Sequence, residues 1–240
     1  MNGLITLNRR AKGVYLASLL MLVCLAPGCL EDSVEDSVDE SELYQGETST
    51  VTMEIIHGDS VANATGNYTI EIELYHDAAP NHSDNFRKHA QQGNYDNVTF
   101  HRIIDDFMIQ GGDFERHDGT GGYAVQWYGY CNGEAMEQSS DCSSETLYTL
   151  PDEANNNLTH IPCMLSMAKT SAPNTGGSQF FIIPEDSTPS WLDGVHTVFG
   201  KVISGCEHVT TLSEVETGAY DRPVIPCLLY TSPSPRDSNL

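Results

Sequence analysis

Apolar and polar residues alternate with a period of two through most of residues 49–226, which is the pattern of strands that bury one face. Two long strands are predicted at residues 50–58 and 67–77, on either side of a turn. Shorter strands, each bounded by Gly, Pro, Asn or Asp, are predicted at residues 98–104, 107–114, 163–169, 178–183 and 197–203. Helices are predicted at residues 79–94, with polar capping candidates after Pro80, and at residues 206–215. This pattern indicates a mainly β fold, a closed or nearly closed barrel.

The N-terminal segment has a different pattern. Three basic residues precede an apolar stretch that is too short for a typical membrane-spanning helix and that ends in small residues before Cys29. This arrangement resembles a lipoprotein signal, so residues 1–28 are predicted to be a signal peptide and Cys29 to carry the lipid. Ordinary signal cleavage, with Cys29 as a bystander, is the alternative.

Residues 29–48 carry eight acidic residues and no basic one. Such a stretch buries too little apolar surface to offset its chain entropy, so it is predicted to be a disordered tether. Together, lipid and tether predict an extracytoplasmic protein anchored to the outer face of the cytoplasmic membrane, with the lipid as its only membrane contact. The formal charge of -23 argues against a nucleic-acid partner, because contacts to phosphates need Lys and Arg.

The cysteines of the strand-rich region differ in their surroundings. Cys131 and Cys142 flank a polar loop and are predicted to close it with a disulfide, although two free thiols remain the alternative. Cys163 and Cys206 lie in apolar contexts and are predicted to be buried thiols. No C-x-x-C or His/Cys pair with zinc spacing occurs, so no structural metal is expected.

The C-terminal stretch "CLLYTSPSPRD" can be back-translated into codons that resemble a transposase sequencing adaptor read in frame. Residues 227–240 are therefore predicted to be an artefact that replaces the native end and lies outside the fold. The last strand would then be interrupted after residue 226, and the barrel would close less well than in the natural protein.

Four motifs, "FHRIIDDFMIQGGDF", "GTGG", "LSMAK…PNTGGSQFFI" and "WLDGVHTVFGKV", follow one another in the order and approximate spacing of the cyclophilins. The chain thus resembles this family of peptidyl-prolyl isomerases over residues 49–226. The resemblance implies a closed eight-stranded antiparallel β-barrel capped by two helices, with the active groove on its outer wall. It also implies a monomer without a cofactor that acts on proline-containing polypeptides.

The resemblance also assigns roles to residues. It makes Arg102 the catalytic arginine, with Gln110 orienting the substrate and Phe107 in the wall of the proline pocket. The other residues that it implies to contact substrate are Met108, Ala168, Lys169, Thr170, Gln179, Phe181, Trp191, Leu192 and His196. Lys169 departs from the Asn of many eukaryotic members, which predicts an altered subsite preference. The resemblance further links Trp191 to the binding of cyclosporin-like ligands.

Elementary chemistry explains why an arginine suits this site. Rotation about an X-Pro bond breaks the donation of the nitrogen lone pair into the carbonyl, and a donor aimed at that nitrogen stabilises the twisted form over either planar form. The expected activity is isomerisation of X-Pro bonds in exported polypeptides, with Arg102 stabilising the twisted amide. A non-catalytic proline-peptide binding module or holdase is the alternative, because the same groove could serve it.

Overall fold

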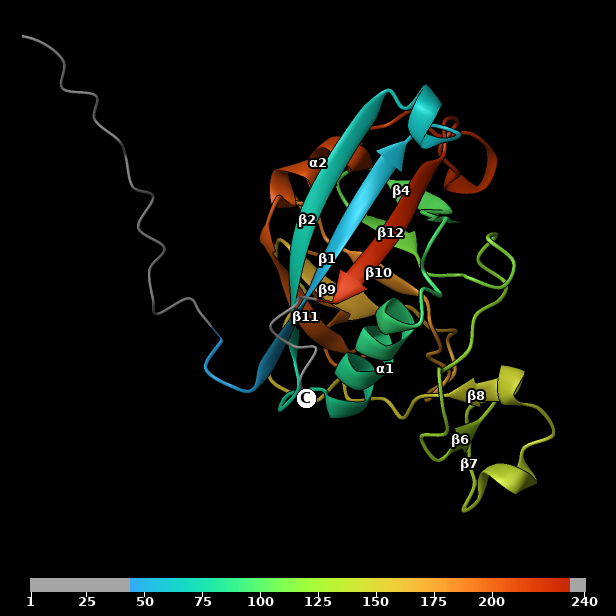
Figure 1. The fold of residues 1–240 in the computed structure, drawn as a ribbon. Coiled ribbons are helices and arrows are strands. Elements are labelled where there is room, and N and C mark those ends of the chain that lie inside the picture. Colours follow the sequence, from blue (N-terminus) through green and yellow to red (C-terminus); the bar gives the residue numbers. More distant parts are fainter. Residues whose placement is uncertain (1–43, 234–240) are drawn as a thin grey trace, which may run out of the picture. The chain divides into compact units, whose positions relative to one another are not determined.

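The computed structural model describes residues 44–233. Its largest element is a nine-stranded antiparallel sheet that curls around an apolar core (Figure 1). The strands lie side by side in the order β3-β12-β1-β2-β11-β9-β10-β5-β4. Their bounds are Thr48–His57 (β1), Gly66–Tyr75 (β2), Val98–Thr99 (β3), Arg102–Ile104 (β4), Met108–Gly111 (β5), Met164–Met167 (β9), Phe180–Ile182 (β10), Val198–Ser204 (β11) and Cys227–Pro233 (β12).

The sheet is open, but its two edge strands are successive pieces of the chain. Only Phe100 and His101 separate β3 from β4. The Phe100 N–H donates to the Cys227 carbonyl in β12, and the His101 N–H donates to the Gln110 carbonyl in β5, both at 3.0 Å. The predicted closed eight-stranded barrel is therefore corrected to a curled, open nine-stranded half-barrel. The chain changes its pairing partner between these two residues, and no ladder joins β3 to β4.

Because apolar and polar side chains alternate along the strands, the apolar ones point to the inner face of the curled sheet and form the core. Met53 in β1 lies opposite Ile70 in β2, and both are fully buried. Glu54 and Glu71, each one position further on, are exposed to solvent. The period of two seen in the sequence thus corresponds to a core face and a solvent face, as strand geometry requires.

The C-terminal strand β12 is an inner strand of this sheet, next to the edge strand β3. It pairs with β1 on one side and with β3 on the other, and the side chains of Cys227 and Leu229 are fully buried. The exclusion of residues 227–240 from the fold is therefore wrong for residues 227–233, because these residues complete the sheet and cover the core. The adaptor origin of the segment stays a prediction.

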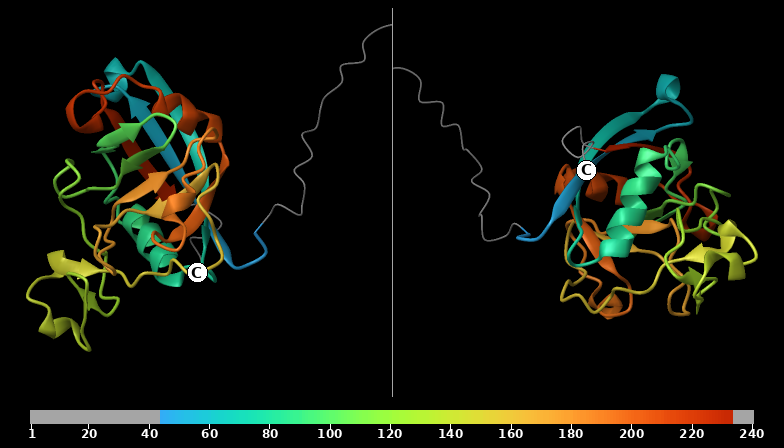
Figure 2. Two further views of the ribbon diagram at one scale, coloured as in Figure 1. Left: turned by 180° about the vertical axis from the view of Figure 1, so that it is seen from behind. Right: turned by 60° about the horizontal axis from the view of Figure 1, so that its bottom comes forward.

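Two helices lie toward opposite ends of the curled sheet (Figures 1 and 2). The first, α1 (Pro80–Gln91), starts with a proline, whose missing N–H would have no partner in the first turn. The predicted capping by nearby polar residues is wrong, because the N-cap is Ala79. The carboxylate of Glu153 instead accepts from the backbone N–H groups of Asn81 and His82, both at 3.2 Å. The second helix is α2 (Cys206–Ser213).

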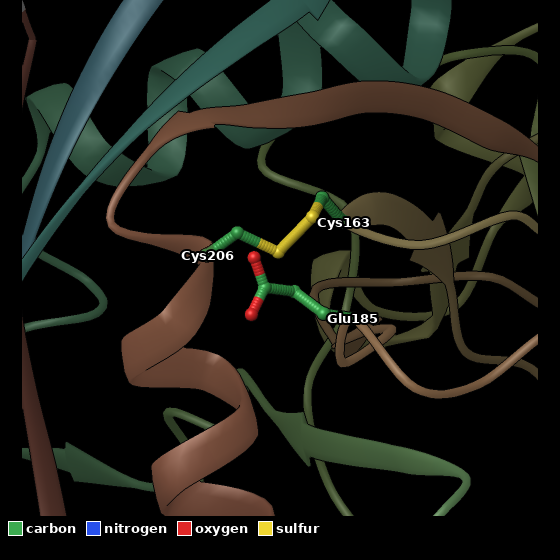
Figure 3. A group of neighbouring side chains, drawn as sticks. All are labelled: Cys163, Glu185 and Cys206. Atoms are coloured by element: carbon green, nitrogen blue, oxygen red, sulfur yellow. A yellow bond between two sulfur atoms is a disulfide. The ribbon is translucent and has the colours of Figure 1, made fainter. Parts of the chain in front are cut away.

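Two disulfides cross-link the described part of the chain. The predicted Cys131–Cys142 bond is confirmed, with its Cα atoms 5.7 Å apart. Cys163 and Cys206, predicted to be thiols, form a second disulfide between the turn before β9 and the start of α2 (Figure 3). That prediction failed because apolar surroundings fit a buried disulfide as well as a buried thiol. The Glu185 carboxylate lies beside this disulfide, but sulfurs bonded to each other leave no thiolate for a metal there.

Residues 123–150 form an insert that carries its own small sheet, seen apart from the main sheet in Figures 1 and 2. Its three strands, in the order β7-β6-β8, are β6 (Tyr130–Cys131), β7 (Glu134–Ala135) and β8 (Tyr148–Thr149). The Cys131–Cys142 disulfide closes the loop after β6. Trp127 packs edge-on against Tyr148, with ring centroids 5.1 Å apart, which joins the insert to the apolar core.

The predicted signal peptide, the lipidation of Cys29 and most of the tether lie outside the described residues. The last residues of the tether belong to the fold: Tyr44 stacks on Tyr75 with ring centroids 4.0 Å apart, and β1 begins at Thr48. Residues 44–48 are therefore moved from the predicted tether to the domain. Within residues 44–233 no helix is long and apolar enough to span a bilayer.

Candidate active site

Three neighbouring strands place a row of side chains on the outer face of the sheet. Arg102 in β4 pairs with Gln110 in β5, and Gln110 pairs with Phe181 in β10. The adjacent row, which is buried in the core, consists of Ile103, Ile109 and Ile182. Because side chains alternate across a strand, the first row points away from the core. The Arg102 side chain, 41% exposed, therefore lies on the outer wall, as the sequence predicts.

A cavity of about 230 Å³ opens at this row. Nine of the twelve residues predicted to contact substrate line it: Arg102, Phe107, Met108, Gln110, Ala168, Lys169, Phe181, Leu192 and His196. These residues come from β4, β5, β10, the 3-10 turn η5 (Ser190–Leu192) and loops, including the one that follows β9. The apolar side chains form a socket, and the charged and amide groups lie at its edge. We call this cavity the main pocket.

His196 forms one wall of the main pocket. Its Nδ1 lies 2.9 Å from the Met167 carbonyl oxygen, so Nδ1–H is the donor. Its ring meets Phe181 edge-on, with centroids 5.7 Å apart. Burial lowers the pKa of His196, which keeps the ring neutral near pH 7. It therefore acts as a fixed wall and contributes no charge to the pocket.

A polar group behind Phe181, which the sequence analysis missed, supports this wall. The ring of His160 stacks on Phe181, with centroids 5.9 Å apart. His160 Nδ1 donates to the Asp193 carboxylate at 2.8 Å, and Nε2 lies 3.0 Å from Ser166 Oγ. Burial lowers the pKa of His160 despite the opposing effect of Asp193. Nothing in the local sequence around His160 indicates this contact, which depends on the fold.

A larger cavity of about 540 Å³ adjoins the main pocket and shares Gln110, Ala168 and Lys169 with it. The predicted substrate residues Thr170 and Gln179 line this side cavity and are absent from the main pocket. The insert contributes to the wall through Asn132, Thr146, Leu147, Tyr148 and Thr149. The insert thus borders the site.

Gln179 fixes the orientation of Gln110. Its Nε2 donates to the carbonyls of Gly119 and Gly121, at 3.0 and 2.8 Å. Its Oε1 then accepts from Gln110 Nε2 at 3.0 Å. Because Gln110 uses its Nε2 in this bond, its Oε1 is not engaged by Gln179. The "GTGG" motif therefore acts through its backbone carbonyls.

Lys169 and Trp191 stand at the edges of the site. The Lys169 ammonium lies 3.5 Å from an Asp152 carboxylate oxygen, and only 6% of its side chain is exposed. Trp191 is 68% exposed and does not line the main pocket, although its ring lies 5.6 Å from that of Phe107. The structure therefore places Trp191 on the rim, next to the wall that Phe107 forms.

Arg102 has an ion-pair partner that the sequence analysis missed. Its Nε donates to Asp221 Oδ2 at 3.3 Å, across 119 positions of sequence. Asp221 ends a short 3-10 turn, η6 (Ala219–Asp221), that packs against β4. A third cavity of about 470 Å³ lies on this side of Arg102 and is also lined by Tyr220 and Arg222.

The site offers positioning and two cationic groups, the Arg102 guanidinium and the Lys169 ammonium, which pairs with Asp152. Among the nine lining residues none is a serine, threonine or cysteine, and the one histidine uses its Nδ1–H for a backbone carbonyl. Such a lining suits an uncharged ring in the socket, with a guanidinium beside the atoms attached to that ring. Reactions that need a rotation and no bond cleavage fit this arrangement best.

Known proteins resemble the chain in sequence and in structure. The model of the cyclophilin type peptidyl-prolyl cis-trans isomerase family matches residues 60–231. Peptidyl-prolyl cis-trans isomerase 9 of Schizosaccharomyces pombe is 45% identical over 65% of this chain and 22% of its own length. Peptidyl-prolyl cis-trans isomerase D of Mycosarcoma maydis is 40% identical, with 40% of its own length covered. This chain therefore spans less than half of either relative.

A shorter relative and a solved structure are covered more fully. Peptidyl-prolyl cis-trans isomerase-like 1 of Rhizopus delemar is 44% identical over 64% of this chain and 79% of its own length. The crystal structure of a cyclophilin type peptidyl-prolyl cis-trans isomerase from Cryptosporidium parvum superposes with a TM-score of 0.61 at 26% identity, covering 79% of this chain and all of the other. The chain belongs to the cyclophilin-type peptidyl-prolyl cis-trans isomerase family.

Proposed function

We propose that the chain catalyses the cis–trans isomerisation of X-Pro peptide bonds in polypeptides. The observation that carries the proposal is the position of Arg102 beside the apolar socket of Phe107, Met108, Phe181 and Leu192. A pyrrolidine ring is a small apolar group that such a socket holds well. The ring nitrogen and the preceding carbonyl then lie at the edge, where the guanidinium and the Gln110 amide are found.

Rotation about the X-Pro bond faces a barrier of roughly 18–20 kcal/mol, because the nitrogen lone pair is delocalised into the carbonyl. In the twisted form that delocalisation is lost, and the nitrogen becomes a better acceptor. A guanidinium that donates to it stabilises the twisted form more than either planar form, which lowers the barrier. A thousandfold acceleration needs only about 4 kcal/mol. One charge-assisted hydrogen bond together with positioning supplies an effect of that order.

The socket contributes by holding one side of the bond. A ring fixed between Phe107 and Phe181 leaves the preceding carbonyl free to rotate. Gln110, oriented by Gln179, can donate to or accept from the neighbouring backbone of the peptide. The apolar walls also exclude water from the guanidinium contact, which strengthens that contact.

Refolding of a protein whose slow step is proline isomerisation tests the proposal. Wild type is expected to accelerate this refolding. Arg102→Ala is expected to lower kcat/KM about 10- to 100-fold, because one hydrogen bond to a charged group is lost. Arg87→Ala is the matched control, because Arg87 lies on α1 and bonds to Asp84. Equal rates for wild type and Arg102→Ala would refute the role of Arg102. Peptide binding without cis–trans exchange in NMR spectra would instead support the proline-peptide binding module or holdase.

We also propose that the chain works outside the cytoplasmic membrane, on exported polypeptides, with Cys29 lipidated. Two disulfides within the described residues support this, because such bonds persist mainly in oxidising compartments. Expression in a bacterial host with a radiolabelled fatty acid tests it. Wild type is expected to take up label in the membrane fraction, and Cys29→Ser to take up none. Label in both, or in neither, would contradict lipidation at Cys29.

Cyclosporin-like ligands are proposed to bind at the rim of the same groove. The support is Trp191, whose exposed ring lies next to Phe107 at the edge of the main pocket. Titration with cyclosporin is expected to change Trp191 fluorescence and to inhibit isomerisation. Trp191→Phe serves as the test variant, with Trp127→Phe in the insert as its control. If the cyclosporin concentration that inhibits wild type inhibits Trp191→Phe equally, Trp191 does not contribute to binding of the ligand.

A further inference from the structure

We propose that Asp221 is a positioning residue for Arg102, an inference that rests on the proposed isomerase function. Asp221 Oδ2 accepts from Arg102 Nε at 3.3 Å. Arg102 also lines the main pocket, so this bond holds the Nε of a guanidinium that borders the pocket. A long side chain in a half-exposed position has many rotamers, and one fixed acceptor on Nε selects among them.

The loop that carries Asp221 is held in place by its own backbone. The Gly218 N–H donates to the Arg222 carbonyl at 2.7 Å, and the Val224 N–H donates to the Glu216 carbonyl at 2.8 Å. The Arg222 guanidinium donates to the Asp118 carbonyl at 3.2 Å, which ties the loop to a neighbouring one. Asp221 is therefore presented by a closed loop and does not sit on a free end.

The backbone at the tip of this loop takes an uncommon conformation. Tyr220 and Asp221 both lie in the left-handed region, with φ of 63° and 58°. A residue other than glycine pays roughly 1–2 kcal/mol to adopt it. Strained residues of this kind cluster at functional sites. Here they form the turn whose Asp221 carboxylate bonds to Arg102, while Tyr220 is 88% exposed.

The pair contributes little to stability and can still control catalysis. Arg102 is 41% exposed and Asp221 48% exposed, and exposed ion pairs stabilise a fold only weakly. Within residues 44–233, Asp221 is the one carboxylate that forms an ion pair with Arg102. Loss of that acceptor frees the guanidinium to leave the edge of the pocket. A catalytic group that moves by an ångström can lose a large part of its effect.

The test compares variants by NMR exchange on a proline peptide. Asp221→Ala is expected to lower kcat/KM about tenfold, chiefly through kcat, with an unchanged melting temperature. Asp221→Glu keeps the carboxylate and is expected to recover most of the activity. Glu216→Gln, an exposed acid on the same loop, is the matched control for charge and should behave as wild type. The Arg102 Nε–H resonance is expected to shift and to exchange faster with water in Asp221→Ala.

A double mutant separates the possible outcomes. In an Arg102→Ala background, Asp221→Ala is expected to change nothing, because its effect passes through the guanidinium. Wild-type activity and an unchanged Nε–H signal in Asp221→Ala, or the same loss with and without Arg102, would overturn the positioning role. An inactive wild type would overturn the proposed function itself, and an Arg102→Ala variant as active as wild type would refute the role of Arg102 on which this inference rests.

Discussion

Ile55 in β1 lies directly opposite Leu229 in β12, and both side chains are fully buried. Leu229 also pairs with Val98 in β3, so one residue joins three strands of the core. We predict that Leu229→Ala lowers the free energy of unfolding by about 2–5 kcal/mol, through lost apolar contact and the cavity that remains. Urea denaturation measures it. Leu228→Ala, the half-buried neighbour, is the control and should cost clearly less. Equal losses would contradict the central place of Leu229.

The second prediction concerns the disulfides. Their sequence separations are 43 positions for Cys163–Cys206 and 11 for Cys131–Cys142. In the chain-entropy description, closing these loops stabilises the fold by about 4 and about 3 kcal/mol. The Cys163→Ala/Cys206→Ala double variant should therefore melt lower than the Cys131→Ala/Cys142→Ala variant, in calorimetry under oxidising conditions. The reverse order would show that the insert, and not the α2 connection, is the more strongly stabilised part.

The third prediction concerns acid. Burial lowers the pKa of His89 from 6.5 to about 4, and the neutral ring bonds to the Tyr123 carbonyl and to the Asn94 amide. Between pH 6.5 and 4 the unfolded chain holds a proton on His89 that the native state lacks, so stability is lost as pH falls through that window. The loss reaches about 3 kcal/mol for this residue. His89→Gln should show a shallower fall of unfolding free energy from pH 7 to pH 5.

The exposed His117 provides the control for that series. His117→Gln should reproduce the wild-type slope of unfolding free energy against pH. A slope in His89→Gln as steep as in wild type would show that His89 does not couple folding to proton binding.

The fourth prediction concerns the insert. Leu147 lines the side cavity and offers an apolar surface to an extended peptide. Leu147→Glu should lower kcat/KM about fivefold for long peptides with apolar residues beside the proline. This factor corresponds to the loss of roughly 1 kcal/mol of apolar contact. A minimal peptide that fills only the main pocket should be unaffected. Val61→Glu, an exposed apolar residue of the turn between β1 and β2, is the control.

Local order predicted the strands, and the resemblance to the cyclophilins predicted the residues of the main pocket. Period-two alternation is a property of neighbouring residues, and the motif around Arg102 and Gln110 carries two strands of one hairpin. The split between β3 and β4 could not be predicted in this way. Phe100 and His101 are both buried, and the hydrogen-bond partner changes between them; a pattern of apolar and polar residues says nothing about partners.

The supporting residues were missed for the same reason. Asp221 reaches Arg102 across 119 positions, and Glu153 reaches the start of α1 across 72 positions. An acid in a polar loop is ordinary in so acidic a chain, so its sequence context gives no sign of a partner. The Cys163–Cys206 bond was missed likewise, because pairing depends on where two distant segments meet.

The strand that completes the sheet is also the last to be synthesised among those described. β1 can pair with β2 as soon as both leave the ribosome, but its other edge has no partner until β12 emerges. Contacts between segments so far apart in sequence form slowly. During that interval the unpaired edge of β1 is a template for any extended chain nearby, so a newly made copy of this chain would itself benefit from a chaperone.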